Sequence, residues 1–162
     1  MSRYRVGMAQ YMLQNYDAAT AAFAGSLAIA PQDDDMYIAD VYWLVLSQLR
    51  AGKADAAQKT LQKHYRPDMY VGHHTAYEKA MRVAAGAAQM EDILATLDEE
   101  TDDLQFAMTA YGLCVLLETH GEIEKADALR EKLLARDGFW FCFSYLAAYS
   151  DYNYTVKPAT VK

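Results

Sequence analysis

The stretch SRYRVGMAQYMLQNYDAATAAFAGSLAIAP, Ser2–Pro31, is the clearest indication of the fold. Its small, aromatic and helix-ending residues have the spacing of two short helices joined by a tight turn: Gly7, Tyr16, Ala19, Phe23, Ser26 and Pro31. We expect Gly7 and Ala19 to let the helices approach closely, and Phe23 to fill the space beside a neighbouring pair. Pro31 ends the second helix because proline lacks a backbone N–H donor. The stretch therefore predicts one helix-turn-helix unit.

The turn of this unit recurs three more times along the chain, at intervals of roughly 35 residues. The second copy is RAGKADAA at Arg50–Ala57 and the fourth is HGEIEKA at His120–Ala126, each with a glycine where a first helix would end. A degenerate third copy, AAQMEDI, lies between them at Ala87–Ile93. One equivalent position in the four copies is then filled by Ala19, Ala57, Ile93 and Ala126. The pattern indicates an array of helical repeats.

No segment of strand length shows the alternation of polar and apolar residues that a half-buried β-strand needs. The sequence predicts an all-α fold, a helical solenoid of about four helix-turn-helix repeats with a C-terminal capping helix, in one domain over residues 1–151. The repeats are expected at 1–31, 35–67, 73–99 and 102–137, the capping helix at 139–151 and a polar tail at 152–162.

Composition limits the classes of function. The chain has 162 residues, of which 53% are hydrophobic, enough for a buried core. A net charge of −7 offers no basic surface to a nucleic acid, and no run approaches the ~18 apolar residues of a membrane-spanning helix. Cys114 and Cys142 lie in apolar helical sequence, which indicates buried thiols and no disulfide framework. The N-terminal residues carry no export signal, so we expect a cytoplasmic protein.

The spacing of the small, aromatic and proline residues resembles that of the tetratricopeptide repeat (TPR) superfamily over nearly the whole chain. The layout is also similar to the later half of bacterial TPR lipoproteins of the new-lipoprotein-I type. The shared parts are DVYWLVLSQLRAGKADAAQKTLQKHY at 40–65, a degenerate pair, a good repeat and the aromatic FWFCFSYLAAY at 139–149. Those lipoproteins act at the outer membrane as adaptors for proteases and peptidoglycan hydrolases. This chain lacks their lipidated N-terminus; as a piece of a longer lipoprotein it would be periplasmic.

In the TPR superfamily the first helix of each pair lines a concave groove that holds a protein or peptide segment. By position, the resemblance implies a groove lined by Tyr4, Met8, Tyr11, Tyr42, Leu46, Leu49, Arg50, Glu78, Arg82, Tyr111, Val115 and Glu118. Tyrosine and methionine would make it an adaptable apolar surface with hydroxyl groups for hydrogen bonds. The alternative is that these aromatic side chains pack between the helices as core. Members of the superfamily that hold a C-terminal carboxylate use lysine, asparagine and arginine at these groove positions. In this chain tyrosine, methionine and leucine dominate the same positions, so we do not expect a carboxylate clamp.

No arrangement of residues points to catalysis. His74 and Glu78 stand four apart on a predicted helix, next to His73, but a metal site needs a third and usually a fourth ligand. Cys114 and His120 do not share a helical face, and the chain has no glycine-rich phosphate loop. We therefore expect a protein that is not an enzyme and uses no metal or cofactor.

The sequence favours a protein–protein adaptor that holds a peptide segment of its partner in the groove. Two alternatives stay open: a peptide-sensing regulatory domain of a larger bacterial signalling protein, and a self-associating structural module. The first predicted helix begins almost at residue 1 with no capping helix before it, and residues 139–154 carry eight aromatic side chains. One capping helix cannot bury them all, so both ends favour a homodimer. We expect its contact near Tyr4, Tyr11 and Phe23 or near the helix at 140–149.

Overall fold

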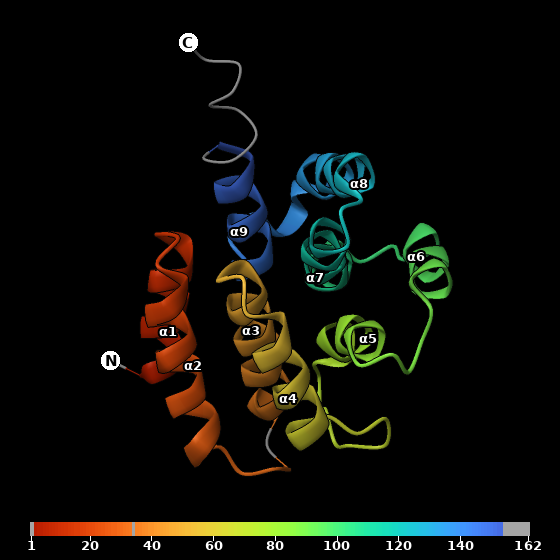
Figure 1. Cartoon of the computed structure of the whole chain (residues 1–162). Helices are drawn as coiled ribbons and strands as arrows, with labels where there is room; N and C mark the ends of the chain where they lie inside the picture. Colours follow the sequence, from red (N-terminus) through yellow and green to blue (C-terminus); the bar gives the residue numbers. More distant parts are fainter. Residues whose placement is uncertain (1, 34, 154–162) are drawn as a thin grey trace.

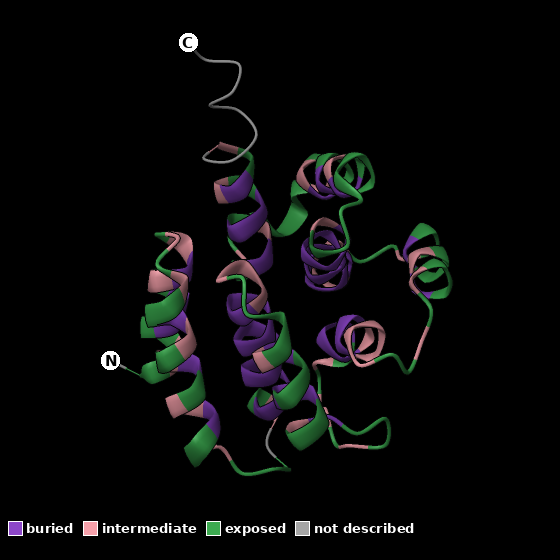
Figure 2. Cartoon of the chain, in the orientation of Figure 1, coloured by how far each residue is buried: buried purple, intermediate pink, exposed green. Residues whose placement is uncertain are grey.

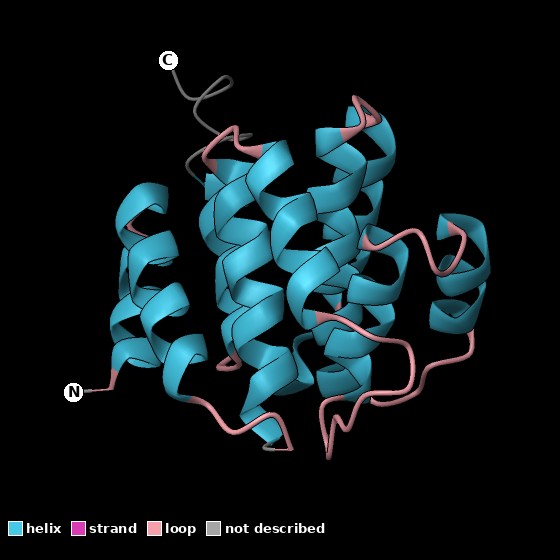
Figure 3. Ribbon diagram, turned by 60° about the horizontal axis from the view of Figure 1, so that its bottom comes forward, coloured by secondary structure: helices cyan, strands magenta, loops and turns pink. Residues whose placement is uncertain are grey.

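The computed structural model describes residues 2–33 and 35–153, and within these ranges the chain is helical and has no β-strand (Figure 3). A short 3₁₀ turn, η1 (Asp137–Phe139), precedes the last helix. The helices are α1 (Arg3–Met12), α2 (Tyr16–Ile29), α3 (Asp35–Arg50), α4 (Ala54–His64), α5 (Thr75–Ala84), α6 (Met90–Asp98), α7 (Asp103–Thr119), α8 (Ile123–Ala135) and α9 (Phe143–Asp151). The prediction of an all-α chain is confirmed. None of the helices described is both long and apolar enough to cross a membrane.

Four tight turns of one kind join the helices α1–α2, α3–α4, α5–α6 and α7–α8 in pairs. In each turn, two successive N–H groups donate back to carbonyl groups near the end of the first helix, as in a Schellman cap. After α3 these donors are Gly52 (3.0 Å) and Lys53 (2.9 Å). The turn needs a positive φ, which is 76° at Gly52, 77° at Gly86 and 78° at Gly121. Gln14 takes the same place in the first turn, with φ of 62°.

Small residues set the distance between neighbouring helices. A Cβ atom on Gly7 of α1 would lie only 2.8 Å from the ring of Phe23 on α2, and Phe23 itself is fully buried. Ala19, Ala57 and Ala126, which share one position of the repeat, have no exposed surface. Because such contacts tolerate no added volume, the sequence is restricted to small residues there. The predicted close contacts at Gly7 and at these alanines are confirmed.

The helix pairs lie side by side, with α1–α2 at one end of the molecule and α7–α8 toward the other (Figure 1). The long helices α3 and α7 occupy the centre. Every residue from Tyr37 to Gln48 and from Phe106 to Leu117 is buried, so these two helices contribute about half of the buried apolar residues (Figure 2). α6 lies to one side and buries only Ile93 and Leu97.

The C-terminal helix α9 differs from the expected cap. It begins at Phe143 rather than at 139, because the chain first bends through η1, and the Cys142 thiol then caps the helix by accepting the N–H of Tyr145 (3.5 Å). α9 contacts α7 and α1 as well as α8, and Figure 1 shows it between α1 and the α7–α8 pair. Ser150 donates to the carbonyl of Met12 (3.2 Å), which ties α9 to the end of α1.

Candidate functional site

The residues predicted to line a groove come from α1, α3, α5 and α7, and the structure covers most of them. Those that are buried are Met8, Tyr11, Tyr42, Leu46, Glu78, Tyr111 and Val115. Those that are partly buried are Tyr4, Leu49, Arg50, Arg82 and Glu118. The expectation of an open surface at these positions is wrong, because neighbouring helices and α9 lie against them. That a partner binds them stays a prediction.

A buried carboxylate anchors α9 directly to two other helices and, through Tyr111, to a third. Asp151, the last residue of α9, accepts hydrogen bonds from Arg50 of α3 (2.5 Å) and from the hydroxyl of Tyr111 on α7 (2.9 Å). Tyr111 thereby uses its only hydroxyl proton, so the hydroxyl of Tyr11 on α1 donates to Tyr111 (2.6 Å). Two of the predicted groove residues, Arg50 and Tyr111, therefore bind one carboxylate of α9, and a third, Tyr11, is linked to it through Tyr111.

The positive charge of Arg50 is matched by a second carboxylate. Arg50 also pairs with Glu118 of α7, and Glu118 pairs in turn with Arg130 of α8. The side chains of Arg50 and Arg130 are only 13% and 3% exposed. Buried charges are stable only when paired and hydrogen-bonded, and here each guanidinium contacts two carboxylates. We call the set Tyr11, Arg50, Tyr111, Glu118, Arg130 and Asp151 the Asp151 network.

Burial controls the protonation of the Asp151 network. It raises the pKa of Asp151, against the opposing effects of the Arg50 charge and the Tyr111 hydrogen bond. It also raises the pKa of Tyr111 and Tyr11 above the ordinary tyrosine value, so both keep the protons that they donate. Burial would lower the pKa of Arg50, but the surrounding tyrosines and Asp151 raise it, and the guanidinium stays charged.

An aromatic cluster fills the rest of the predicted groove. The fully buried ring of Trp43 lies 5.3 Å from that of Tyr11 and 5.8 Å from that of Tyr111, measured between centroids. Next to it, the centroids of Tyr42 and Tyr77 are 4.3 Å apart, and the Tyr42 hydroxyl donates to a backbone carbonyl of α7 (2.8 Å). Sequence reasoning missed Trp43 and Tyr77, although both stand beside or among the residues that it named.

The residues considered as metal ligands have structural partners. The Glu78 carboxylate accepts hydrogen bonds from the Tyr65 hydroxyl (2.6 Å) and from Nε of Arg82 (3.0 Å). Nδ1 of His74 lies 2.6 Å from the carbonyl oxygen of Asp35, so Nδ1 carries the proton and donates it. Within residues 2–33 and 35–153, no three His, Cys, Asp or Glu side chains gather as metal ligands would.

Both cysteines are free thiols, as their sequence context predicts, but only Cys114 is buried as expected. Cys114 is fully buried, and burial raises the pKa of its thiol to about 12. Cys142 is half-buried, and burial raises the pKa of its thiol as well. Neither thiol is therefore activated as a nucleophile, because the reactive form is the thiolate.

Part of the aromatic segment at 139–154 is exposed, as its number of aromatic residues led us to expect. Trp140 and Phe141 are each 60% exposed and Tyr149 is 56% exposed, whereas the Tyr145 hydroxyl donates to a carbonyl of α8 (2.9 Å). The predicted aromatic position Tyr154 lies outside the described residues. Association of two molecules through this surface stays a prediction.

The chain has no match among known proteins in three comparisons. No family model, no curated protein and no solved structure matches it. The resemblance to the TPR superfamily therefore depends on the spacing of residues in this sequence alone.

Proposed function

We propose that the chain is a TPR-like scaffold that binds helical segments of partner proteins on the inner faces of α1, α3 and α7 and carries out no reaction itself. Two features support the repeat architecture. The four turns share one hydrogen-bonding pattern, and equivalent alanines are buried in three of the four pairs. Arg50, Glu78, Tyr111 and Glu118 of the predicted groove are paired within the chain, which supports a structural role for them over a catalytic one.

The observation that carries the proposal is the position of α9. This helix buries a face of small residues, Ser144, Ala147 and Ala148, and places the Asp151 carboxylate between Arg50 and Tyr111. Small residues allow close approach of a helix, and a carboxylate held by a cation and a hydroxyl fixes its register. The groove thus has the chemistry of a helix-binding site, and α9 is its occupant in this structure.

A partner helix would therefore compete with α9 for the same contacts. It would carry small residues on one face and an acidic side chain about two turns further along, as α9 does with Ser144 and Asp151. Because α9 is covalently attached, its effective concentration at the groove is high. A partner helix therefore displaces α9 only if its own affinity and concentration outweigh that effective concentration. An adaptor and a peptide-sensing regulator would both use this competition.

A peptide of residues 142–153, with serine in place of Cys142 and a fluorescent label, tests the proposal. The variant Asp151→Ala loosens the protein's own α9, and we expect the peptide to bind this variant several-fold more tightly than the unchanged protein. The matched control is the same peptide with alanine at the Asp151 position, which should bind the variant no better than the unchanged protein. Fluorescence anisotropy measures binding, and circular dichroism verifies that the variant stays helical.

Equal binding of the two peptides by the variant would contradict the proposal, because the carboxylate would then contribute nothing to recognition. Absence of binding to a variant that keeps its helical signal would contradict it as well. If Asp151→Ala does not fold, Asp151→Asn keeps the shape of the side chain and removes its charge, and the same comparison is made with it.

A further inference from the structure

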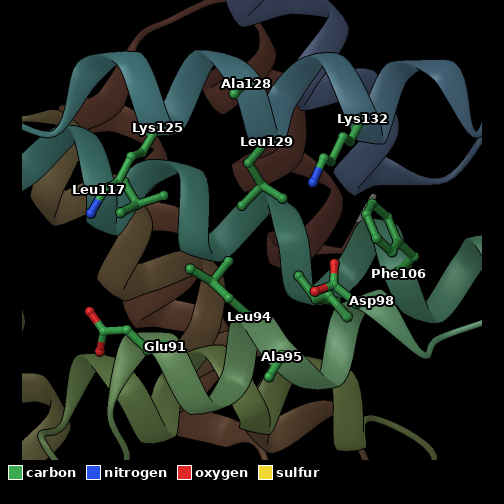
Figure 4. Close-up of a pocket in the computed structure, with 11 residues that line it drawn as sticks. Glu91, Leu94, Ala95, Asp98, Phe106, Leu117, Lys125, Ala128, Leu129 and Lys132 are labelled. Carbon is green, nitrogen blue, oxygen red and sulfur yellow. The ribbon is translucent and has the colours of Figure 1, made fainter.

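An open cleft lies between α6 and α8, on a face that α9 does not cover. Its volume is about 410 Å³, with α7 as its floor (Figure 4). Leu94 of α6 and Leu129 of α8 point toward each other across it, and Phe106 closes one end. The lining is apolar: Phe106 and Leu117 of α7 lie at the floor, and the buried Leu97 of α6 and Leu129 of α8 lie on the walls.

The two edges of the cleft carry opposite charges. Glu91 and Asp98 stand on the α6 edge, and Lys125 and Lys132 stand on the α8 edge, all of them exposed. On each helix the two charged residues are seven positions apart, which is about two helical turns. Lys125 pairs with Glu122 (2.9 Å), the residue that precedes α8, whereas Asp98 and Lys132 form no ion pair among the residues described. One edge is therefore acidic and the other basic along the whole cleft.

The cleft exists because α6 is short and loosely attached. α6 packs on α5 and α7, and its Leu94 stays half-exposed at the open side. α6 belongs to the degenerate third copy of the repeat. A half-exposed leucine on one wall and an apolar floor are the features of a surface that gains stability when a second apolar surface covers it.

We propose that this cleft docks an amphipathic helix of a partner protein. Apolar side chains of that helix at positions i, i+3 or i+4, and i+7 would enter between Leu94 and Leu129. Its basic edge would lie along Glu91 and Asp98, and its acidic edge along Lys125 and Lys132. Because the two edges of the cleft differ in sign, the charges of the helix also fix its direction.

A second copy of this chain does not supply that helix. Among the described residues, a group of exposed apolar side chains lies in and just before α9, at Trp140, Phe141, Leu146 and Tyr149, whereas Leu13, Ile29, Tyr70 and Ile123 are exposed singly elsewhere in the sequence. From Phe139 to Ser150 the sequence has no charged residue, so α9 has no charged edges to match those of the cleft. The occupant that fits the cleft is a helix flanked by both signs of charge. The proposal concerns a different face from the groove and does not depend on the proposed function.

Three designed helical peptides with the same leucine seam test the proposal: one with a lysine edge and a glutamate edge, one with two lysine edges and one with two glutamate edges. The unchanged protein should bind the mixed peptide most tightly. In the double variant Lys125→Glu, Lys132→Glu both edges of the cleft are acidic, and preference should change to the peptide with two lysine edges. Because two exposed ion pairs are involved, the ratio of the affinities for these two peptides should change about fivefold or more.

The matched control is Lys59→Glu, Lys63→Glu on α4, which changes the net charge equally at two exposed lysines. This control should keep the preference for the mixed peptide. In addition, Ala128→Trp should fill the cleft and abolish binding, while Ala18→Trp on the exposed face of α2 should not. Fluorescence anisotropy gives each affinity.

Equal binding of the three peptides, or no binding of any, would overturn the proposal. A change of preference in the α4 control would also overturn it, because net charge alone would then explain the result. Self-association that Ala128→Trp abolishes would assign the cleft to a second copy and refute the choice of a foreign helix. None of these results depends on α9, so they leave the groove proposal to its own test.

Discussion

The substitution Asp151→Ala removes the carboxylate that holds α9 in place. It deletes two hydrogen bonds to a charged group, one from Arg50 and one from Tyr111. Such bonds contribute about 1.5–3 kcal/mol each. Arg50 keeps its pair with Glu118, but the hydroxyl proton of Tyr111 loses its acceptor, because Tyr111 only accepts from Tyr11. We therefore expect a loss of about 3–5 kcal/mol in the free energy of unfolding, the range for breaking a buried pair.

Urea unfolding followed by circular dichroism measures this loss. Asp98→Ala is a matched control, because Asp98 also ends a helix of nine residues but is exposed and forms no ion pair among the described residues. That control should change stability by less than about 0.5 kcal/mol, as surface substitutions usually do. If the two variants lose the same amount, Asp151 is not an anchor, and the reasoning about α9 fails.

Three further predictions concern packing, pH and association. Ala57→Leu overfills a fully buried contact and should cost about 1–3 kcal/mol in the same assay; an unchanged stability would show that the repeat register is wrong. Because burial raises the pKa of Tyr11 and Tyr111, the stability that they contribute is complete below pH 10 and is lost as the pH rises above it. The melting temperature should thus fall above pH 10, and fall less in Tyr111→Phe. If the exposed aromatic residues form a homodimer, light scattering should give about twice 18.2 kDa, and Trp140→Ser with Phe141→Ser should return the mass to 18.2 kDa; a single-chain mass at every concentration would contradict it.

The helix pairs were predictable because their signals are local. Gly52 and Gly121 end helices because the turn that follows requires a positive φ, and the requirement is visible in the sequence. Gly7 opposite Phe23 is likewise a contact within one unit of the repeat. These short-range constraints are sufficient for an all-α chain with paired helices.

The closure of the groove depends on contacts that the sequence does not indicate. Arg50 and Asp151 are 101 positions apart, and an aspartate near the end of a chain resembles a surface residue. The tyrosines at equivalent positions, Tyr42 and Tyr111, suggested a binding surface, but both are fully buried. Tyrosine recurs at this position because the ring packs in the core and the hydroxyl donates to an acceptor within the chain. Packing as core was the alternative that the sequence left open.

The cleft between α6 and α8 was not predicted either, for a different reason. Its charged residues are spaced seven apart on two helices, a pattern that any solvent-exposed helix face shows. The pattern marks a cleft only because α6 and α8 stand apart, and their separation follows from the weak packing of the degenerate third repeat. The degeneracy itself was visible at Ile93, where the other three copies have alanine.

If α9 is a separable occupant of the groove, it should open locally, and amide hydrogen exchange measured by mass spectrometry tests this most directly. In the unchanged protein, we expect the amides of α9 to exchange far more slowly than those of a free peptide. In Asp151→Ala, we expect the amides of α9 to exchange faster while those of α3, including Trp43, stay protected, because local opening precedes global unfolding. Exchange of α9 at the free-peptide rate in the unchanged protein, or equal acceleration of α9 and α3 in the variant, would contradict the claim that α9 is separable.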